Sequence, residues 1–261
     1  MFSQLVTVLG LAALGAASPA FRNATLAAEA LASTTVLSPH AIDCERTVQG
    51  LTKADCRYLS SIGFTGPGSN PSSNSAGKIW LGSNGPNIFT FANKANTDVV
   101  LVLWDDSNSY ASSFVTQYAP KLTVSIAAGG RTTISLANGV TGAWSAVYRG
   151  GVAGPTKVSA NGQVENTWGE FTTGEWATVD VSRLITMSGN QFSVKVGTGC
   201  QADNARCAYV CKSGSTCWLS GSYDLIGCKN QPNNNAWYGG ADPEGGCAGW
   251  SNGGKIDVEF L

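Results

Sequence analysis

The sequence predicts an all-β protein, built as a two-sheet sandwich or a barrel, with a disulfide-rich stretch near its C-terminus. Three observations predict this fold class. Short runs of β-branched and aromatic residues recur along the chain, each bounded by Gly, Asn, Asp or Pro. Glycine accounts for 32 of the 261 residues, which favours a chain with many turns over a helical one. Six of the eight cysteines fall within one short C-terminal stretch.

Residues 1–18 have the features of a secretory signal peptide. The apolar run over residues 5–14 is too short to span a bilayer, and the small residues that follow it suit a signal peptidase. Asn23 begins an Asn-Ala-Thr sequon that survives cleavage, so it is a glycosylation candidate. We therefore expect a secreted protein with no membrane anchor.

Residues 19–77 are expected to form an N-terminal arm or pro-segment. Cys44 and Cys56 within it are close enough in sequence to bridge each other. Residues 66–77 consist almost entirely of Gly, Ser, Asn and Pro, a composition typical of a linker or a long exposed loop. We place the domain boundary there and expect a folded domain over residues 78–261.

The strands of this domain follow one another without a βαβ rhythm. Residues 99–103 are apolar throughout, which predicts a strand buried on both faces. Residues 256–260 alternate instead, with Ile256, Val258 and Phe260 on one face. This spacing of short strands is typical of a sandwich or barrel. The strands are expected at residues 79–81, 88–92, 99–104, 122–126, 132–136, 144–148, 178–181, 192–196 and 256–260.

Composition excludes several classes of function. Charged residues make up only 13% of the chain and the net charge is −1, so neither nucleic acid nor an anionic membrane surface is an expected partner. His40 is the only histidine, which leaves no Ser-His-Asp triad and no multi-histidine metal site. The oxygens of residues 105–109 suit calcium, but that segment lacks the central Gly and terminal Glu of an EF-hand loop. We expect no metal and no cofactor.

The clustered cysteines point to disulfides. They lie among Gly, Asn and Ser with no histidine to complete a zinc site, so they are expected to brace loops that lack a core of their own. Disulfides persist in oxidising compartments, which again places the protein outside the cell. The sequence leaves the pairing of these six open: Cys200, Cys207, Cys211, Cys217, Cys228 and Cys247.

The order of segments resembles the thaumatin and osmotin family. Thr167-Trp168-Gly169-Glu170-Phe171 and the later Val179-Asp180-Val181-Ser182 are similar to the family's Leu-Ala-Glu-Phe and Tyr-Asp-Ile/Val-Ser segments, and Gly199-Cys200 with Arg206-Cys207 is similar to its Gly-Cys and Arg-Cys pairs. The resemblance implies a thaumatin-like two-sheet β-sandwich with a small disulfide-rich lobe over residues 200–254. It also implies a cleft between the two, which in several relatives is acidic and binds β-1,3-glucan. The chain further resembles small thaumatin-like proteins secreted by fungi, some of them discussed as effectors on plants.

Glu170 and Asp180 are the carboxylates that match the family's acidic cleft. Glycoside hydrolysis needs two carboxyl groups facing each other across the bond, so Glu170 would be the acid and Asp180 the base of a hydrolase. The alternative is that both are ordinary strand and turn carboxylates.

Departures from the family favour binding over hydrolysis. The second aspartate of the family falls at Ile185 or Thr186, which cannot perform acid-base chemistry. The cleft arginine falls near Ala146. Arg149 is close in sequence, but its parity is opposite to that of Trp144, so we expect it to point away from the cleft.

Aromatic and amide side chains in the C-terminal lobe are candidate ligand-binding residues. Exposed rings stack on sugars while amides hydrogen-bond hydroxyl groups. Alternatively, each ring is the local core of the disulfide lobe. The candidates are Trp218, Trp237, Tyr238, Trp250, Asn233, Asn234 and Asn235.

Three hypotheses follow. The first is a secreted, monomeric, non-catalytic binding protein that recognises β-glucan or a partner protein at the cell wall or in the host apoplast, as a candidate virulence effector or elicitor. The second is a weak endo-β-1,3-glucanase that uses Glu170 and Asp180. In the third, the disulfide lobe inhibits or binds a host defence protein and sugar plays no part.

Overall fold

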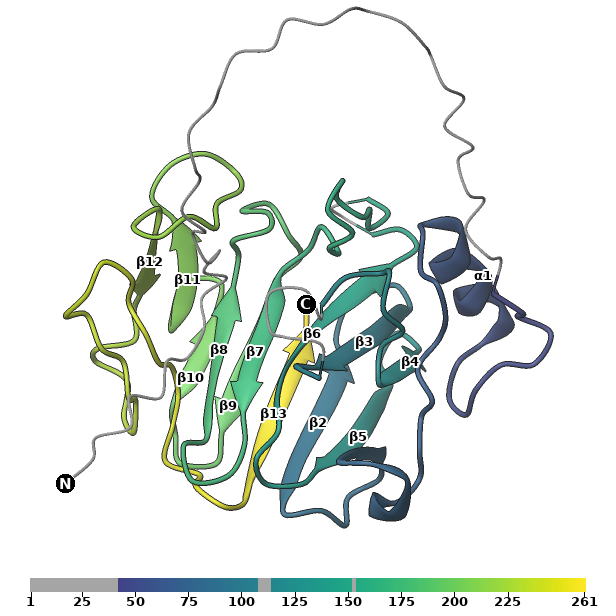
Figure 1. Cartoon of the computed structure of the whole chain (residues 1–261), viewed down its shortest axis with the longest axis horizontal. Helices are drawn as coiled ribbons and strands as arrows, with labels where there is room; N and C mark the ends of the chain where they lie inside the picture. Colours follow the sequence, from purple (N-terminus) through teal and green to yellow (C-terminus); the bar gives the residue numbers. More distant parts are fainter. Residues whose placement is uncertain (1–41, 108–113, 152–153) are drawn as a thin grey trace, which may run out of the picture.

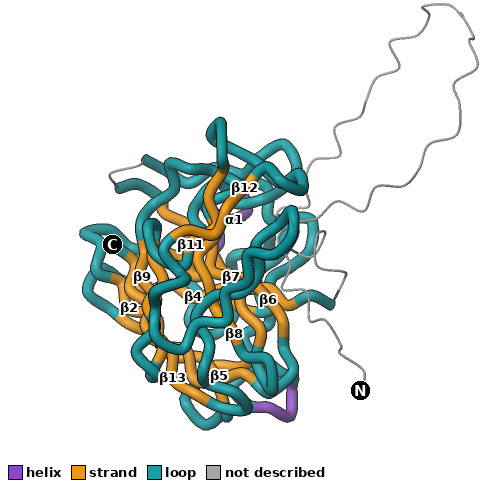
Figure 2. Tube along the Cα trace, turned by 90° about the vertical axis from the view of Figure 1, so that its left-hand side faces the viewer, coloured by secondary structure: helices purple, strands orange, loops and turns teal. Residues whose placement is uncertain are grey.

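The computed structural model describes residues 42–107, 114–151 and 154–261. Two mixed β-sheets pack face to face, with strand orders β1-β5-β2-β13-β9-β10 and β12-β11-β8-β7-β6-β3-β4 (Figure 1). Figure 2 shows β2, β9 and β13 of the first sheet and β6, β7 and β8 of the second on opposite sides of the core. The expected two-sheet sandwich is confirmed. The expectations for the signal peptide, Asn23, His40 and residues 108–109 lie outside the described residues.

The C-terminal strand, β13, lies in the interior of the six-stranded sheet. That strand lies parallel to β2 and antiparallel to β9, so the end of the chain fills the middle of the sheet. The alternation expected over residues 256–260 is confirmed, because Ile256, Val258 and Phe260 are buried and the residues between them are exposed. The sheet contains β1 (Ile79–Leu81), β2 (Asn87–Asn93), β5 (Arg131–Leu136), β9 (Phe192–Val196), β10 (Gln201–Asp203) and β13 (Gly254–Phe260).

The seven-stranded sheet carries Glu170 and Asp180 on two neighbouring strands. Its strands are antiparallel except where β11 lies parallel to β8. All residues from Val99 to Trp104 are buried, as the unbroken apolar run predicts. The sheet contains β3 (Val99–Asp105), β4 (Leu122–Ile126), β6 (Thr141–Tyr148), β7 (Trp168–Thr172), β8 (Thr178–Ser182), β11 (Ala208–Cys211) and β12 (Tyr223–Ile226).

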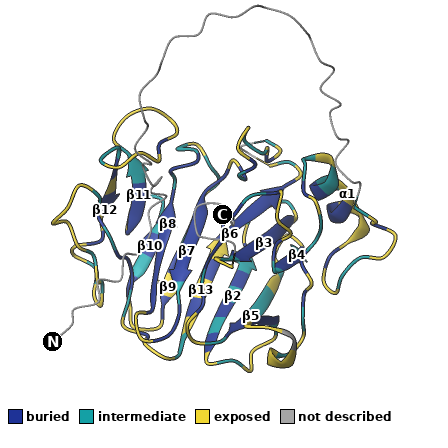
Figure 3. Cartoon of the chain, viewed as in Figure 1, coloured by how far each residue is buried: buried dark blue, intermediate teal, exposed yellow. Residues whose placement is uncertain are grey.

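The main core fills the space between the sheets. Trp144 of β6 meets Phe89 of β2 edge to face, with ring centroids 5.8 Å apart. Gly169 on the neighbouring strand makes room for this indole, because a Cβ at residue 169 would lie 2.1 Å from it. Strand residues that face the core are buried, and much of the connecting loops is exposed (Figure 3).

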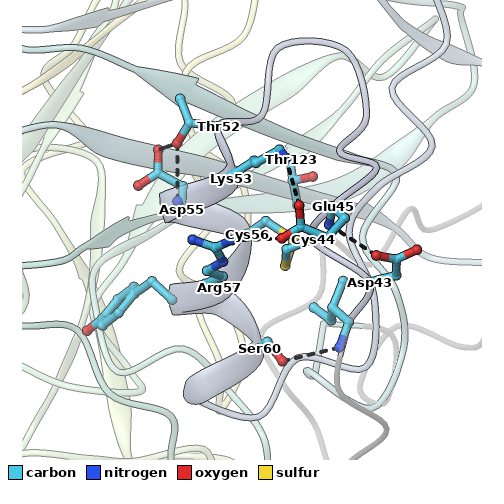
Figure 4. The surroundings of a disulfide bond; sticks show 12 residues. Asp43, Cys44, Glu45, Thr52, Lys53, Asp55, Cys56, Arg57, Ser60 and Thr123 are labelled. Atoms are coloured by element: carbon cyan, nitrogen blue, oxygen red, sulfur yellow. Dashed lines mark hydrogen bonds and ion pairs between the residues drawn. A yellow bond between two sulfur atoms is a disulfide. The ribbon is translucent and has the colours of Figure 1, made fainter.

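A second core covers the outer face of the seven-stranded sheet at one end. Helix α1 (Lys53–Ser61) packs there beside Phe64, which stacks on Trp104 with centroids 5.9 Å apart. The Cys44–Cys56 disulfide holds the loop before the helix (Figure 4), and the side chain of Thr52 accepts a hydrogen bond from the backbone N–H of Asp55 as an N-cap.

The segment expected to be a linker is part of the packed structure. The Asn70 amide binds the backbone of Thr123 at both its N–H (2.8 Å) and its C=O (2.6 Å), and so pairs with β4 as a strand residue would. Asn70 is buried, and a short 3₁₀-helix, η1 (Asn74–Ala76), follows. Side-chain pairing with a free sheet edge is a tertiary contact that composition does not reveal. The N-terminal unit therefore packs against the sandwich instead of being separated from it by a linker.

All eight cysteines are paired, and three disulfides brace the lobe that contains β11 and β12. This lobe lies at the end of the molecule opposite α1 in Figure 1. Among the described residues, no helix is long and apolar enough to cross a membrane. The lobe pairs are Cys200–Cys247, Cys207–Cys228 and Cys211–Cys217.

Candidate functional site

Glu170 and Asp180 lie directly opposite each other on neighbouring strands. They are paired in the register of β7 and β8, and a row across the outer face of the sheet continues from them through Ala143 to Trp104. Opposed residues of an antiparallel pair have Cβ atoms about 4.5–5.5 Å apart. The structure thus brings the two predicted carboxylates together. Both are buried, with exposed fractions of 6% for Glu170 and 0% for Asp180.

Asp180 sits in an environment that disfavours its charge. Burial, and then the charge of Glu170, raise the pKa of Asp180 well above its usual value. Neither carboxyl oxygen of Asp180 has a hydrogen-bond partner among the described residues. Asp180 therefore keeps its proton at pH values where an exposed aspartate is ionised.

The disulfide lobe is attached directly to β8 beside Asp180. Val179 and Cys247 exchange two backbone hydrogen bonds of 2.9 and 2.8 Å, and Cys247 is bonded to Cys200. Gly246 lies against Asp180, because a Cβ at residue 246 would be 2.5 Å from the Val179 carbonyl oxygen and 3.0 Å from Asp180 Cβ. The lobe therefore borders the acid pair as one wall.

Two tyrosines and two acids of this wall belong to the same site. The Tyr209 hydroxyl donates to the Gly245 carbonyl at 3.0 Å, and burial followed by the charges of Asp180 and Glu170 raises its pKa. Burial and then Asp242, to which Tyr223 is hydrogen-bonded, raise the pKa of that tyrosine.

These four residues were not predicted from the sequence to belong to the site. Asp242-Pro243-Glu244 was the available signal for the two acids, but only the fold places them with Glu170 around Tyr223, whose pKa all three raise. Burial and then Asp242 raise the pKa of Glu244. The site is therefore more acidic than the matched pair of carboxylates alone.

Three of the predicted aromatic residues are exposed on the lobe. Trp218, Trp237 and Tyr238 have exposed fractions of 41%, 50% and 45%. Their two loops are tied together by Asp242, which accepts hydrogen bonds from Ser220 Oγ at 2.6 Å and from the Gly221 N–H at 2.7 Å. The backbone at Gly239 lies against the Trp237 indole, since a Cβ there would be 2.5 Å from the ring. The loops that carry the rings are thus tied together, and a large part of each ring remains accessible.

Trp250 differs from that expectation. It is only 3% exposed and packs against Phe89 of the main core, with centroids 5.8 Å apart. The reason is its position just before β13, which places the ring between the sheets, where it cannot stack on a ligand.

The three asparagines mainly hold the lobe together. Asn233 Nδ2 donates to the Thr198 carbonyl at 2.9 Å, and Asn234 Nδ2 donates to the Gln231 carbonyl at 2.6 Å. Asn235 Oδ1 accepts from the Gly246 N–H at 2.8 Å and from the Thr178 hydroxyl at 3.2 Å. These atoms are engaged in contacts within the lobe, so the asparagines position the wall beside Asp180.

Arg149 lies away from the acid pair, as expected, but the parity argument for it was wrong. Ala143 is paired with Glu170, so both side chains lie on the outer face of the sheet, while Trp144 points into the core. Arg149 is six residues after Ala143, an even number, so strand alternation would put it on the same face as Glu170. Arg149 lies apart because β6 carries it toward α1, where its Nε contacts Asp55 Oδ1 at 2.9 Å.

The site does not form a metal centre from the residues that the structure describes. The one group of candidate ligands among them is Cys200, Cys207 and Cys247, whose sulfurs lie within 4.8 Å of one another. All three are already in disulfides.

Two hollows of the surface lie away from the acid pair. One of about 530 Å³ lies over the outer face of the six-stranded sheet, beside Thr90, Lys195 and Asp257. Another of about 470 Å³ lies beside Trp176, which is 57% exposed and was not singled out from the sequence. Neither is lined by Glu170 or Asp180.

No known family model matches this chain, and no curated protein matches it. Among solved structures, it is similar to a thaumatin-like xylanase inhibitor at 13% identity, over 66% of this chain and 98% of that one, with a TM-score of 0.31. It is also similar to a protein elicitor from Magnaporthe oryzae at 12% identity, over 67% of this chain and 98% of that one, with a TM-score of 0.27. The two mixed sheets and the disulfide-braced lobe are the architecture that the sequence resemblance implied.

Proposed function

We propose that this chain is a secreted, non-catalytic, thaumatin-like protein that binds β-glucan as a monomer, at the cell wall or in the host apoplast. The observation that carries the proposal is the set of three exposed rings, Trp218, Trp237 and Tyr238, on a lobe held by disulfides beside an acidic row. Rings fixed before binding lose little conformational entropy when a sugar stacks on them.

The burial of the acid pair favours binding over hydrolysis. Glu170 and Asp180 are paired across β7 and β8, and glycoside hydrolysis requires two carboxyl groups that face each other. A catalytic acid or base must come within hydrogen-bond reach of the glycosidic oxygen or of water, however. Asp180 is fully buried, so it cannot make that contact.

Secretion agrees with the four disulfides. Cytosolic proteins keep such thiols reduced, and a lobe braced by three disulfides needs an oxidising compartment. The cell wall and the apoplast are such compartments, and β-glucan is exposed in them.

The test is a pull-down of the purified protein on insoluble β-1,3-glucan, with chitin and cellulose in parallel. We expect retention on β-1,3-glucan, and about a tenfold loss of affinity for the Trp237→Ala variant. Trp80→Phe is a matched control, because Trp80 is buried in the six-stranded sheet, away from the lobe. Equal retention of all three proteins, or no retention of any, contradicts the proposal. Reducing-end release that is lost in Glu170→Gln would instead establish the glucanase.

A second candidate function is binding of a host protein, as an inhibitor or elicitor. The observation that favours it is Leu219, which is 63% exposed beside Trp218 and gives the lobe tip an apolar character that sugars do not require. Infiltration of the purified protein into leaf tissue tests this role. A host response that Leu219→Ser abolishes, with glucan retention unchanged, would assign the tip to a protein partner.

A further inference from the structure

A hollow of about 470 Å³ lies beside the hairpin that joins β7 to β8. Three loops form it: this hairpin, the turn between β5 and β6, and the turn that precedes β13. The side chains that matter below are Asn138, Thr141, Thr172, Glu175, Trp176 and Asn252.

Backbone hydrogen bonds fix the three loops to one another. The Thr173 N–H donates to the Val140 carbonyl at 2.8 Å, and the Gly139 N–H donates to the Thr173 carbonyl at 3.1 Å. The Asn252 N–H donates to the Gly174 carbonyl at 2.8 Å. Gly174 has a φ of +100°, and a Cβ there would be 2.9 Å from the Gly139 nitrogen, so this close approach requires glycine. The hollow is therefore formed before any ligand arrives.

The lining combines one exposed indole with hydroxyl and amide groups. Trp176, at 57%, is the most exposed of the eight tryptophans. The hydroxyls of Thr141 and Thr172 lie 3.3 Å apart on the floor, and the amides of Asn138 and Asn252 flank them. Among the described residues of the lining, Glu175 is the only charged one and none is Lys or Arg. An aromatic face with neutral donors and acceptors suits a neutral, hydroxyl-rich ligand, while the absence of cations disfavours an anionic one.

The hollow shares a sheet face with the acid pair. Thr172 pairs with Thr178 in the same register that pairs Glu170 with Asp180, and residues two apart on a strand point to the same face. Thr172 is thus about 7 Å along the strand from Glu170. Asp180, which borders the lobe wall at Gly246, is opposite Glu170 on β8.

We propose that the Trp176 hollow is a separate subsite for one neutral sugar unit, stacked on the indole and hydrogen-bonded to the threonine and asparagine side chains. This inference rests on the proposed glucan-binding function and extends its contact surface beyond the lobe. The sugar chain would contact Trp176 beside the β7–β8 hairpin as well as the rings of the lobe attached to β8.

The test uses the full chain labelled with 5-fluorotryptophan, followed by ¹⁹F NMR as a β-1,3-linked glucose hexamer is added. Resonances of Trp176, Trp237 and the buried Trp144 are assigned by single Trp→Phe variants. We expect the Trp176 and Trp237 signals to shift with ligand and the Trp144 signal to stay. The Trp176→Ala variant should bind the hexamer about tenfold more weakly than wild type does. For a glucose dimer, which would occupy one of the two contact sites at a time, wild type and variant should have equal affinity at the lobe.

The outcomes separate this inference from the function on which it rests. A shift at Trp237 with none at Trp176 overturns the subsite and leaves glucan binding by the lobe intact. A shift at Trp176 with none at Trp237 establishes the subsite and removes the lobe from the sugar contact. No shift at either, together with no retention on insoluble glucan, refutes both.

Discussion

Removing the Cys200–Cys247 disulfide should destabilise the protein more than removing its neighbour Cys211–Cys217. The first pair closes a loop with a sequence separation of 47, and the second one with a separation of 6. In the chain-entropy model, the loss in unfolding free energy is about 4 kcal/mol for the first pair and about 2 kcal/mol for the second. Cys200 and Cys247 are also fully buried, so the cavities left by alanine add to the first value.

The assay compares two double variants, Cys200→Ala/Cys247→Ala and Cys211→Ala/Cys217→Ala, by guanidinium unfolding without reductant. A difference of about 2 kcal/mol between them is expected in the extrapolated free energy of unfolding. Hydrogen exchange adds a local measurement, because the Val179 and Cys247 amides bond each other's carbonyls beside Asp180. These amides should exchange faster only in the first variant. Equal stability losses, or unchanged exchange at Val179, would refute the idea that this disulfide holds the lobe against β8.

Three further predictions concern single residues. Asp180→Asn should be more stable than wild type at neutral pH. The raised pKa of Asp180 means that the folded state binds the proton more tightly than the unfolded state, so wild-type stability falls as the pH rises from about 4 toward the raised pKa. In thermal melts, the stability difference between variant and wild type should therefore vanish below about pH 4. Gly246→Ala should lower the free energy of unfolding by about 1–3 kcal/mol, because its Cβ would clash with Val179. The control Gly150→Ala, whose Cβ meets nothing within 4 Å, should lower it by less than about 0.5 kcal/mol. Equal melting temperatures of the two variants would contradict this prediction. Asp55→Ala should lower the free energy of unfolding in urea by about 2–4 kcal/mol. This buried carboxylate accepts hydrogen bonds at 2.8 Å from Thr52 and 2.6 Å from Ser125, and it pairs with Arg149 at 2.9 Å. A loss below about 0.5 kcal/mol would show that α1 does not depend on Asp55.

The sequence predicted the main strands well because their hydrophobic patterns are local. The apolar run of β3 and the alternation of β13 are each visible within a few residues. Strands β7, β10, β11 and β12 were not among the expected strands. Strand β7 has Gly169 and Glu170 in place of an unbroken β-branched or aromatic run, and the other three are only three or four residues long and lie among cysteines and turn residues. Helix α1 was missed as well, although Thr52 three residues before Asp55 is an N-terminal capping signal.

The site was partly predictable for a related reason. Glu170 and Asp180 each lie in a short motif of consecutive residues, so both carboxylates could be found from the sequence. The contact of Gly246 with Asp180 depends on the pairing of Cys247 with Val179, which is not local in sequence. Trp176 was missed because a single tryptophan in a hairpin has no distinctive pattern, and its exposure is set by contacts among three separate loops.

The acid pair and the disulfide of the lobe bear on the same question, which is whether Asp180 ever reaches a substrate. It is paired with Glu170 across β7 and β8, and a glycosidase needs two facing carboxyl groups, so the pairing alone does not exclude hydrolysis. Access to Asp180 would require Gly246 to move away. That movement breaks both hydrogen bonds between Val179 and Cys247, and the Cys200–Cys247 disulfide opposes it. If the Cys200→Ala/Cys247→Ala variant gains reducing-end release from β-1,3-glucan, the lobe suppresses a latent hydrolase; if it stays inactive while its Val179 amide exchanges faster, exposure of the pair is not sufficient, and the carboxylates serve recognition.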